Sequence, residues 1–119
     1  MRKENILKTK SFAFALEVIK VYKYLREEHK EYILSKQLLR SGTAIGALVR
    51  ESENAASTKD FINKLNVALK EADETLYWLE LLHQSFYLNE DCFKLMYGIC
   101  NELVSILIAS IKTLKLKLN

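Results

Sequence analysis

The hydrophobic residues of this chain recur at steps of three and four positions, the spacing that collects side chains on one face of an α-helix. Four segments show this pattern, and we predict helices over residues 10–28, 32–54, 58–86 and 90–116. Short polar stretches separate them, of which EEHKE is the first. Amphipathic helices with short connections predict an all-α fold, an antiparallel up-down-up-down four-helix bundle that forms one domain over residues 1–119.

Each predicted helix has an apolar stripe that we expect to face the core. In the first helix the stripe is Phe12, Leu16, Ile19, Tyr22 and Leu25, and in the second it is Leu34, Leu38, Ile45 and Val49. In the third it is Phe61, Leu65, Ala68, Ala72, Leu76, Leu79 and Phe86, and in the fourth Phe93, Met96, Cys100, Leu103, Leu107 and Ser110 or Ile111. Ser57 or Thr58 can cap the third helix, because a hydroxyl accepts a hydrogen bond from the free N–H groups of a first turn. Asn89 is the corresponding start signal for the fourth.

The composition favours helices over β-structure. Half of the 119 residues are hydrophobic and 28% are charged, while proline is absent and glycine occurs three times. Gly42 and Gly46 fall inside the second predicted helix, where a glycine costs up to about 1 kcal/mol relative to alanine. We therefore predict that they let a neighbouring helix or subunit approach closely. A phosphate-binding loop is excluded, because no Gly-Lys-Ser/Thr follows and no strand precedes the glycines.

Charge is distributed unevenly along the chain, although the formal net charge is only +3. Residues 1–50 carry eleven Lys and Arg against five Asp and Glu, and residues 51–111 carry four against ten. Lys112, Lys115 and Lys117 make the last segment basic again. This pattern fits a surface that attracts a polyanion, or complementary surfaces on two copies of the chain, or ordinary solvated helix faces.

The cysteines and the N-terminus indicate a cytoplasmic protein. Cys92 and Cys100 are the only cysteines, and on one helix they would lie about 12 Å apart along its axis, too far for a disulfide. We expect buried free thiols in a reducing compartment. The first 20 residues contain no uninterrupted apolar run or cleavage site of a signal peptide, and no stretch of about 18 apolar residues predicts a membrane span.

No enzyme, metal or cofactor is indicated by the sequence. Glu80 and His83 form a Glu-x-x-His pair, but a di-iron bundle needs two such pairs and two further carboxylates. The acidic run around Glu71 and Glu74 has lysines within one or two turns, which favours ion pairing over acid–base chemistry. No serine stands in a G-x-S-x-G turn.

Tyrosines alternate with basic residues in the first predicted helix, around Lys20, Lys23 and Arg26. Such a pattern can stack bases of a single-stranded nucleic acid while cations contact its phosphates. The alternative is that the aromatic residues, Trp78 among them, fill the core or a subunit interface. Like Gly42 and Gly46, Trp78 is assigned to helix packing or to contacts between subunits.

One central run of the sequence resembles the 23S rRNA-intervening-sequence protein family. The resemblance rests on LSKQLLRSGTAIG at 34–46, Ala55-Ala56-Ser57, DFINKL at 60–65, ALKEADET at 68–75 and YWLELL at 77–82. The FAFALEVIKVYKYL segment also fits the opening of that family, so the likeness covers nearly the whole chain. Where such proteins commonly have an asparagine this chain has Leu48, which argues against a polar role at that position.

The resemblance implies an antiparallel four-helix bundle that assembles into a ring-shaped homopentamer. It also implies a connection with ribosomal RNA genes, without an established reaction. A similar pentameric bundle is the accessory protein of diversity-generating retroelements, which binds nucleic acid and a reverse transcriptase. RNA or DNA, a reverse transcriptase and other copies of the chain are therefore the expected partners, and no membrane is expected.

Two hypotheses for the function follow. In the first, the protein is a non-enzymatic oligomer that binds RNA or DNA through Lys20, Lys23, Arg26, Lys36 and Arg40. In the second, it is a structural or adaptor ring whose charge asymmetry and Gly42/Gly46 surface serve subunit packing.

Overall fold

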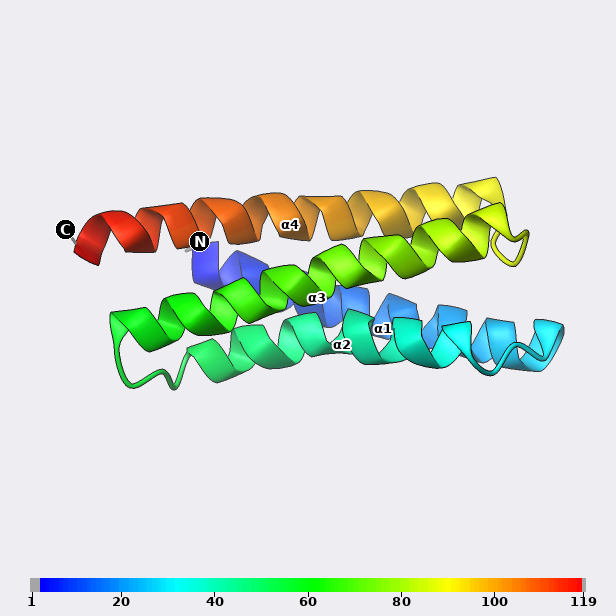
Figure 1. The fold of residues 1–119 in the computed structure, drawn as a ribbon, viewed down its shortest axis with the longest axis horizontal. Helices are drawn as coiled ribbons and strands as arrows, with labels where there is room; N and C mark the ends of the chain where they lie inside the picture. Colours follow the sequence, from blue (N-terminus) through cyan, green and yellow to red (C-terminus); the bar gives the residue numbers. More distant parts are fainter. Residues whose placement is uncertain (1–2, 119) are drawn as a thin grey trace.

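The computed structural model describes residues 3–118, with side chains from Ile6 onward, and they form an all-helical fold (Figure 1). The helices are α1 (Lys3–His29), α2 (Leu34–Ser52), α3 (Thr58–Gln84) and α4 (Glu90–Leu118). Helix α1 begins seven residues before the predicted start, because Leu7 and Ser11 continue its buried face towards the N-terminus. The other helix ends lie within two residues of the predicted ones.

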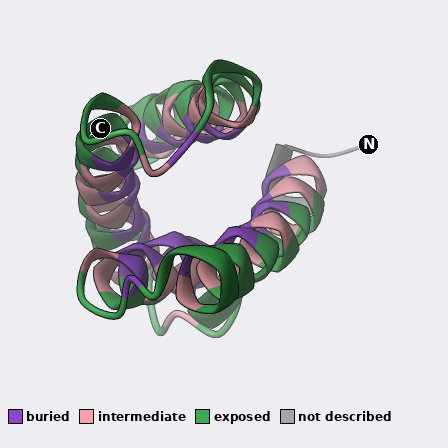
Figure 2. Cartoon of the chain, turned by 90° about the vertical axis from the view of Figure 1, so that its right-hand side faces the viewer, coloured by how far each residue is buried: buried purple, intermediate pink, exposed green. Residues whose placement is uncertain are grey.

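The four helices lie side by side in an elongated helical bundle of 50 × 22 × 22 Å (Figure 1). Helix α2 packs against α1 and α3, and α3 packs against α4. Helices α1 and α4 share the least extensive contact of the neighbouring pairs. Figure 2 shows the buried residues on the inward sides of the helices. The residues that meet between helices are consistent with the predicted antiparallel packing, since Gly42 lies against Val18 and Gly46 against Ser11.

The core-facing stripe predicted for the first helix is wrong in most of its positions. Phe12 and Leu16 are 53% and 49% exposed, whereas Phe14 and Val18 are fully buried. Adjacent helical residues differ by about 100°, so Phe12 and Phe14 project to nearly opposite sides of α1. Helix α1 therefore has two apolar faces, and the spacing of its hydrophobic residues does not distinguish the core face from the outer one.

The stripes predicted for the second and fourth helices are confirmed, because all of their members are buried or packed against the core. The third stripe is confirmed except at Phe86, which is 90% exposed. Phe86 follows the end of α3 with a φ of 68°, a left-handed conformation that favours glycine. The N–H of Tyr87 there donates to the carbonyl of Leu82, which closes the last helical turn.

Side chains cap the starts of three helices. Ser57 Oγ accepts from the N–H of Asp60 at 3.1 Å, and the Asp60 carboxylate accepts from the N–H of Ala56. Asn89 Oδ1 accepts from the N–H of Cys92, as its start signal predicted. At α2 the cap is Glu31, a buried carboxylate that accepts from the N–H groups of Ile33, Leu34 and Ser35.

Helix α4 is long and apolar enough to cross a membrane, by length and composition alone. Only 22% of its most apolar window is buried within this chain, and Leu95 and Ile108 are 58% and 50% exposed. Core helices of bundles pass the same test, so the expectation that no membrane is involved stays a prediction.

Candidate functional site

Three of the five predicted phosphate-binding residues, Lys23, Arg26 and Lys36, lie near the end of the bundle where α1 turns into α2. Lys23 and Lys36 are exposed, and neither makes an ion pair with any residue that the structure describes. The Arg26 guanidinium lies 5.3 Å from the centre of the Tyr22 ring and 4.9 Å from that of Tyr32. The two rings orient a cation without neutralising it.

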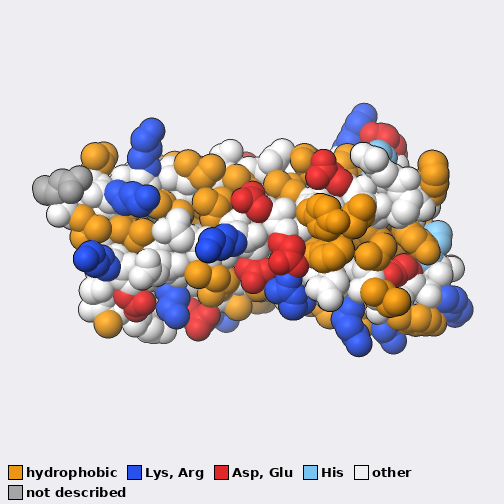
Figure 3. Space-filling model, in the orientation of Figure 1, with side chains coloured by type: hydrophobic (Ala, Val, Ile, Leu, Met, Phe, Trp, Pro, Cys, Tyr) orange, Lys and Arg blue, Asp and Glu red, His pale blue; other side chains and the backbone are white. Residues whose placement is uncertain are grey.

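The packing register of α1 on α2 brings these cations together. Gly42 meets Val18 and Gly46 meets Ser11, so residue numbers fall along α1 as they rise along α2. This register places Lys23 level with Lys36, and one turn further on Arg26 of α1 contacts Tyr32 in the loop that precedes α2. Figure 3 shows Lys and Arg side chains gathered at this end of the molecule, along its lower right edge. We call Lys23, Arg26, Lys36 and the ring of Tyr32 the basic end.

Lys20 lies one turn before Lys23 and is exposed, with its ammonium 3.4 Å from the Glu17 carboxylate. An exposed pair of this kind contributes little to stability and exchanges readily with other partners. Lys20 therefore remains accessible to a phosphate, but part of its charge is compensated within α1.

Arg40 does not join the basic end. Its guanidinium bonds the carboxylates of Glu71 and Glu74 across the contact between α2 and α3. Trp78 Nε1 donates to Glu74 at 2.9 Å, and this bond, followed by that of Arg40, lowers the pKa of Glu74. The bond to Glu74 raises the pKa of Arg40. The cation predicted to contact phosphate thus has its charge matched by two carboxylates of its own chain.

The outer face of α1 and α2 forms an apolar groove of about 550 Å³ that the sequence analysis did not find. Phe12, Leu16 and Ile19 line it from α1, and Gly46 and Ala47 line it from α2. Arg50 covers one end, with its guanidinium 5.6 Å from the centre of the Phe12 ring. The signal was present in the sequence, as a second apolar stripe on α1, but it was assigned to the core.

Gly42 and Gly46 position α1 over α2. A Cβ at Gly42 would lie 2.8 Å from Val18 Cγ2, and one at Gly46 would lie 3.3 Å from the Ser11 carbonyl oxygen. The first distance is shorter than two carbon atoms tolerate, so the Val18 side chain or α1 itself would have to shift to make room for a side chain there. Gly98 has no atom within 4 Å of its Cβ position.

Exposed aromatic and apolar residues surround the two loops at the basic end. Tyr24 OH bonds His29 Nε2 at 2.9 Å, and the His29 ring meets the edge of Tyr87 from the α3–α4 loop. Ile33 is 76% exposed and Phe86 is 90% exposed. The sequence places His29 in a polar hinge and Phe86 in a core stripe, and only the fold shows that loops 30–33 and 85–89 share one end (Figure 1).

The titratable groups outside these surfaces have structural partners. His83 bonds Glu90 at 3.0 Å and stacks on Phe93, rather than pairing with Glu80. Within residues 3–118, no three His, Cys, Asp or Glu side chains are grouped so that they could hold a metal ion. Burial raises the pKa of the Cys100 thiol to about 12, and Cys100 Sγ lies 3.4 Å from the Ala72 carbonyl. Burial also raises the pKa of Cys92.

Comparison with known proteins identifies a family, and solved structures of similar fold are known. The model of the 23S rRNA-intervening sequence protein family matches residues 3–109. A crystal structure of a protein of unknown function from the S23 ribosomal protein family of Bacteroides thetaiotaomicron VPI-5482 is 50% identical in sequence, with a TM-score of 0.92. The match covers 93% of this chain and 99% of that one. No curated protein matches the sequence.

Proposed function

Because the chain belongs to the 23S rRNA-intervening sequence protein family, we propose that it is a non-enzymatic cytoplasmic protein that binds a single-stranded nucleic acid, RNA in particular, at the basic end. One observation carries this proposal. The Arg26 guanidinium contacts the rings of Tyr22 and Tyr32, at the same end of the bundle as two exposed lysines that make no ion pair among the residues that the structure describes.

This arrangement matches the two requirements of single-strand binding. Lysines that are not neutralised release counterions when they contact phosphates, which supplies affinity without sequence preference. The exposed ring of Tyr32 offers a face on which a base can stack, and Arg26 beside it adds a cation to that platform. Arg40 is left out of the proposed surface because Glu71 and Glu74 already bind it, and Lys20 extends the surface along α1.

The test measures the affinity for a fluorescent single-stranded RNA and for a duplex as salt is raised. The double variant Lys23→Ala/Lys36→Ala should reduce the slope of log affinity against log salt by about 0.7 for each lysine on a single strand. Tyr32→Ala should weaken binding about tenfold with little change in that slope. The matched control is Lys59→Ala/Lys112→Ala, which removes two exposed lysines elsewhere. Equal losses in the two double variants, or no binding at low salt, would overturn the proposal.

A second candidate function, an adaptor ring of several copies, is favoured by the apolar groove on α1 and α2. Phe12 and Leu16 leave about half of their surfaces exposed in it, and exposed apolar grooves rimmed by polar residues often mark contacts with another protein. We propose that a second copy of the bundle covers this groove, in the pentameric ring that the family resemblance implies. A protein partner such as a reverse transcriptase would then bind the assembled ring.

Light scattering on the purified protein tests this second candidate. Phe12→Glu should convert the oligomer to a monomer, because a carboxylate in a buried apolar interface lacks a partner. Val67→Glu is the matched control, since Val67 is 42% exposed on α3, away from the groove. An oligomer that survives Phe12→Glu, or a wild-type monomer at high concentration, would exclude the groove as the subunit contact.

A further inference from the structure

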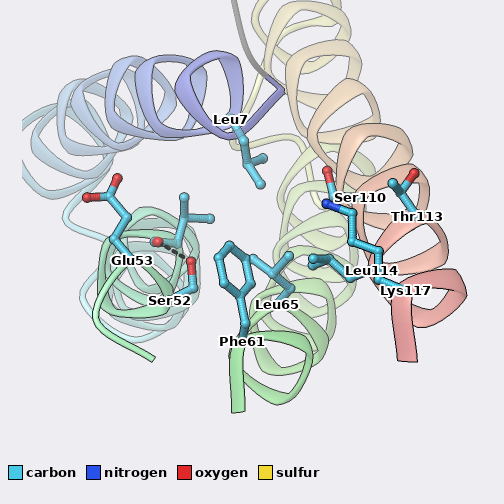
Figure 4. Close-up of a pocket in the computed structure, with 10 residues that line it drawn as sticks. Leu7, Ser52, Glu53, Phe61, Leu65, Ser110, Thr113, Leu114 and Lys117 are labelled. Carbon is cyan, nitrogen blue, oxygen red and sulfur yellow. Dashed lines mark hydrogen bonds between the residues drawn. The ribbon is translucent and has the colours of Figure 1, made fainter. Parts of the chain in front are cut away.

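A small cavity lies at the end of the bundle opposite the basic end. Its volume is about 60 Å³, and it opens between the starts of α1 and α3 and the ends of α2 and α4 (Figure 4). The walls are mainly apolar and come from all four helices: Leu7, Val49, Phe61, Leu65 and Leu114. None of these residues belongs to the basic end or to the apolar groove.

Most polar groups around the cavity already have partners. Ser52 Oγ donates to the carbonyl of Val49, and Thr113 Oγ1 donates to that of Ala109. Glu53 pairs with Lys8 at 3.3 Å. Ser110 Oγ is different, because it is buried and has no hydrogen-bond partner within the described part of the chain. A buried hydroxyl without a partner is destabilising, so an additional group is expected to satisfy it.

Lys117 is a second polar group at the cavity, and unlike Ser110 it is exposed to solvent. It lines the cavity seven residues after Ser110, two helical turns further along the same side of α4. A helical side chain leads back towards the N-terminus of its helix, and Figure 4 shows the Lys117 amine directed towards Ser110 over Leu114. Lys117 forms no ion pair with the residues described. The cavity thus combines apolar walls with one hydroxyl and one ammonium.

We propose that this cavity binds an unbranched aliphatic carboxylate. Ser110 Oγ–H and the Lys117 ammonium donate to the carboxylate oxygens, and the alkyl chain lies among Leu7, Leu65 and Leu114. An engineered cavity of about 150 Å³ holds benzene, so 60 Å³ excludes an aromatic ring and accommodates a few methylene groups. A cation is disfavoured by Lys117, whose exposed ammonium attracts a carboxylate, and a neutral alcohol lacks the charge that would pair with it.

Titration with acetate, butanoate, hexanoate and octanoate tests the cavity itself. Affinity, measured by the shifts of leucine methyl signals in NMR spectra, should rise about fourfold per added CH₂ until the chain fills the cavity, and should then level off. The shifts should be confined to Leu7, Leu65 and Leu114. Affinity that increases without a plateau, or shifts spread over the groove residues, would show non-specific partitioning and overturn the proposal.

Head group and side chains are tested separately. Octylamine and octan-1-ol should bind more weakly than octanoate, and Lys117→Gln should weaken octanoate binding about tenfold. The matched control is Lys112→Gln, an exposed lysine on the outer side of the same helix, which should bind octanoate as the wild type does. Ser110→Ala should also weaken octanoate binding, with an unchanged circular dichroism spectrum.

The result that overturns the proposal is equal binding of octylamine and octanoate, or unchanged binding in both Lys117→Gln and Ser110→Ala. In that case a water molecule is the partner of Ser110. Because nucleic acid is absent from these titrations and the basic end lies at the other end of the bundle, their outcome is independent of the proposed function.

Discussion

Helix α2 packs against α3 on one side and against α1 on the other, and the side chains that lie above these two contacts at the surface differ. On the side that faces α3, the interior contact is a hydrogen bond between Thr75 and Ser41, and a charged network of Arg40, Glu71 and Glu74 covers it. On the side that faces α1, the interior contact is made by glycines, and exposed apolar side chains lie above it. Both contacts are made by small residues, so the difference lies in the surface residues above them. We call Arg40, Glu71 and Glu74 the α2–α3 rim, and Phe12 and Leu16 the α1–α2 rim.

This difference indicates which surface of the molecule is available for binding a partner. The polar groups of the α2–α3 rim are bonded to one another, and a partner would have to break these bonds to use them. The α1–α2 rim instead leaves Phe12 and Leu16 partly exposed to water, so covering it removes apolar surface from water without breaking a hydrogen bond. A partner is therefore expected on α1 and α2, with the basic end at one end of the same surface.

The largest effect on stability is expected from Gly42→Leu, which disturbs the contact between α1 and α2. A Cβ at this position already comes within 2.8 Å of Val18, so a leucine must push α1 away or distort it. We expect the free energy of unfolding to fall by about 3 kcal/mol, at the upper end for overpacked sites, as measured by urea denaturation.

Gly98→Leu is the matched control for this substitution. It introduces the same side chain on a helix with no atom within 4 Å of the Cβ position, and it should leave stability unchanged or raised by a few tenths of a kcal/mol to about 1 kcal/mol. Similar losses of unfolding free energy in the two variants would mean that the close approach of Val18 is not the reason for a glycine at position 42.

A smaller effect on stability is expected from Thr75→Val, which removes the buried hydrogen bond between α2 and α3. The substitution keeps the shape of the side chain but leaves the buried Ser41 hydroxyl without its interhelical partner at 2.9 Å. We expect a loss of about 1–3 kcal/mol in thermal or urea unfolding. The double variant Ser41→Ala/Thr75→Val should recover part of this loss, since no unpaired hydroxyl remains. Additive losses would contradict a coupled pair.

The sequence predicts the fold better than it predicts these rims. Four helices, the core stripes of α2 and α4, and the caps at Ser57 and Asn89 follow from local spacing, which is a property of each helix alone. Helix α1 shows the limit, because two apolar stripes satisfy the same spacing and only its packing on α2 decides that Phe14 is buried and Phe12 exposed.

The candidate site shows the same limit for charge. Arg40 looks equivalent to Lys36 in the sequence, yet the carboxylates that bind it lie more than 30 residues away on α3. Glu31 was read as part of a polar hinge, but it is buried and caps α2. Which charges remain available is decided by partners that are distant in sequence, so counting charges along the chain could not separate these residues.

The smallest effect is expected from acid on the α2–α3 rim. Bonds from Trp78 and Arg40 lower the pKa of Glu74 from the ordinary value of 4.5, so its ionised form is favoured in the folded state. A carboxyl group whose pKa is lowered by folding stabilises the folded state at pH values above its unfolded-state pKa. This stability is lost as the pH falls through the folded-state pKa. The network is well exposed, so water and salt screen it and the loss should be small.

Urea denaturation of the wild type and of Trp78→Phe, at neutral pH and at several values below pH 4.5, tests the effect. Trp78→Phe removes the hydrogen bond that contributes most to the shift while it keeps an aromatic ring in place. The stability difference between the two proteins should therefore narrow as the pH falls through this range. A difference that stays constant would mean that Trp78 stabilises α3 by packing alone, and the α2–α3 rim would then be closed by Arg40 without help from the indole.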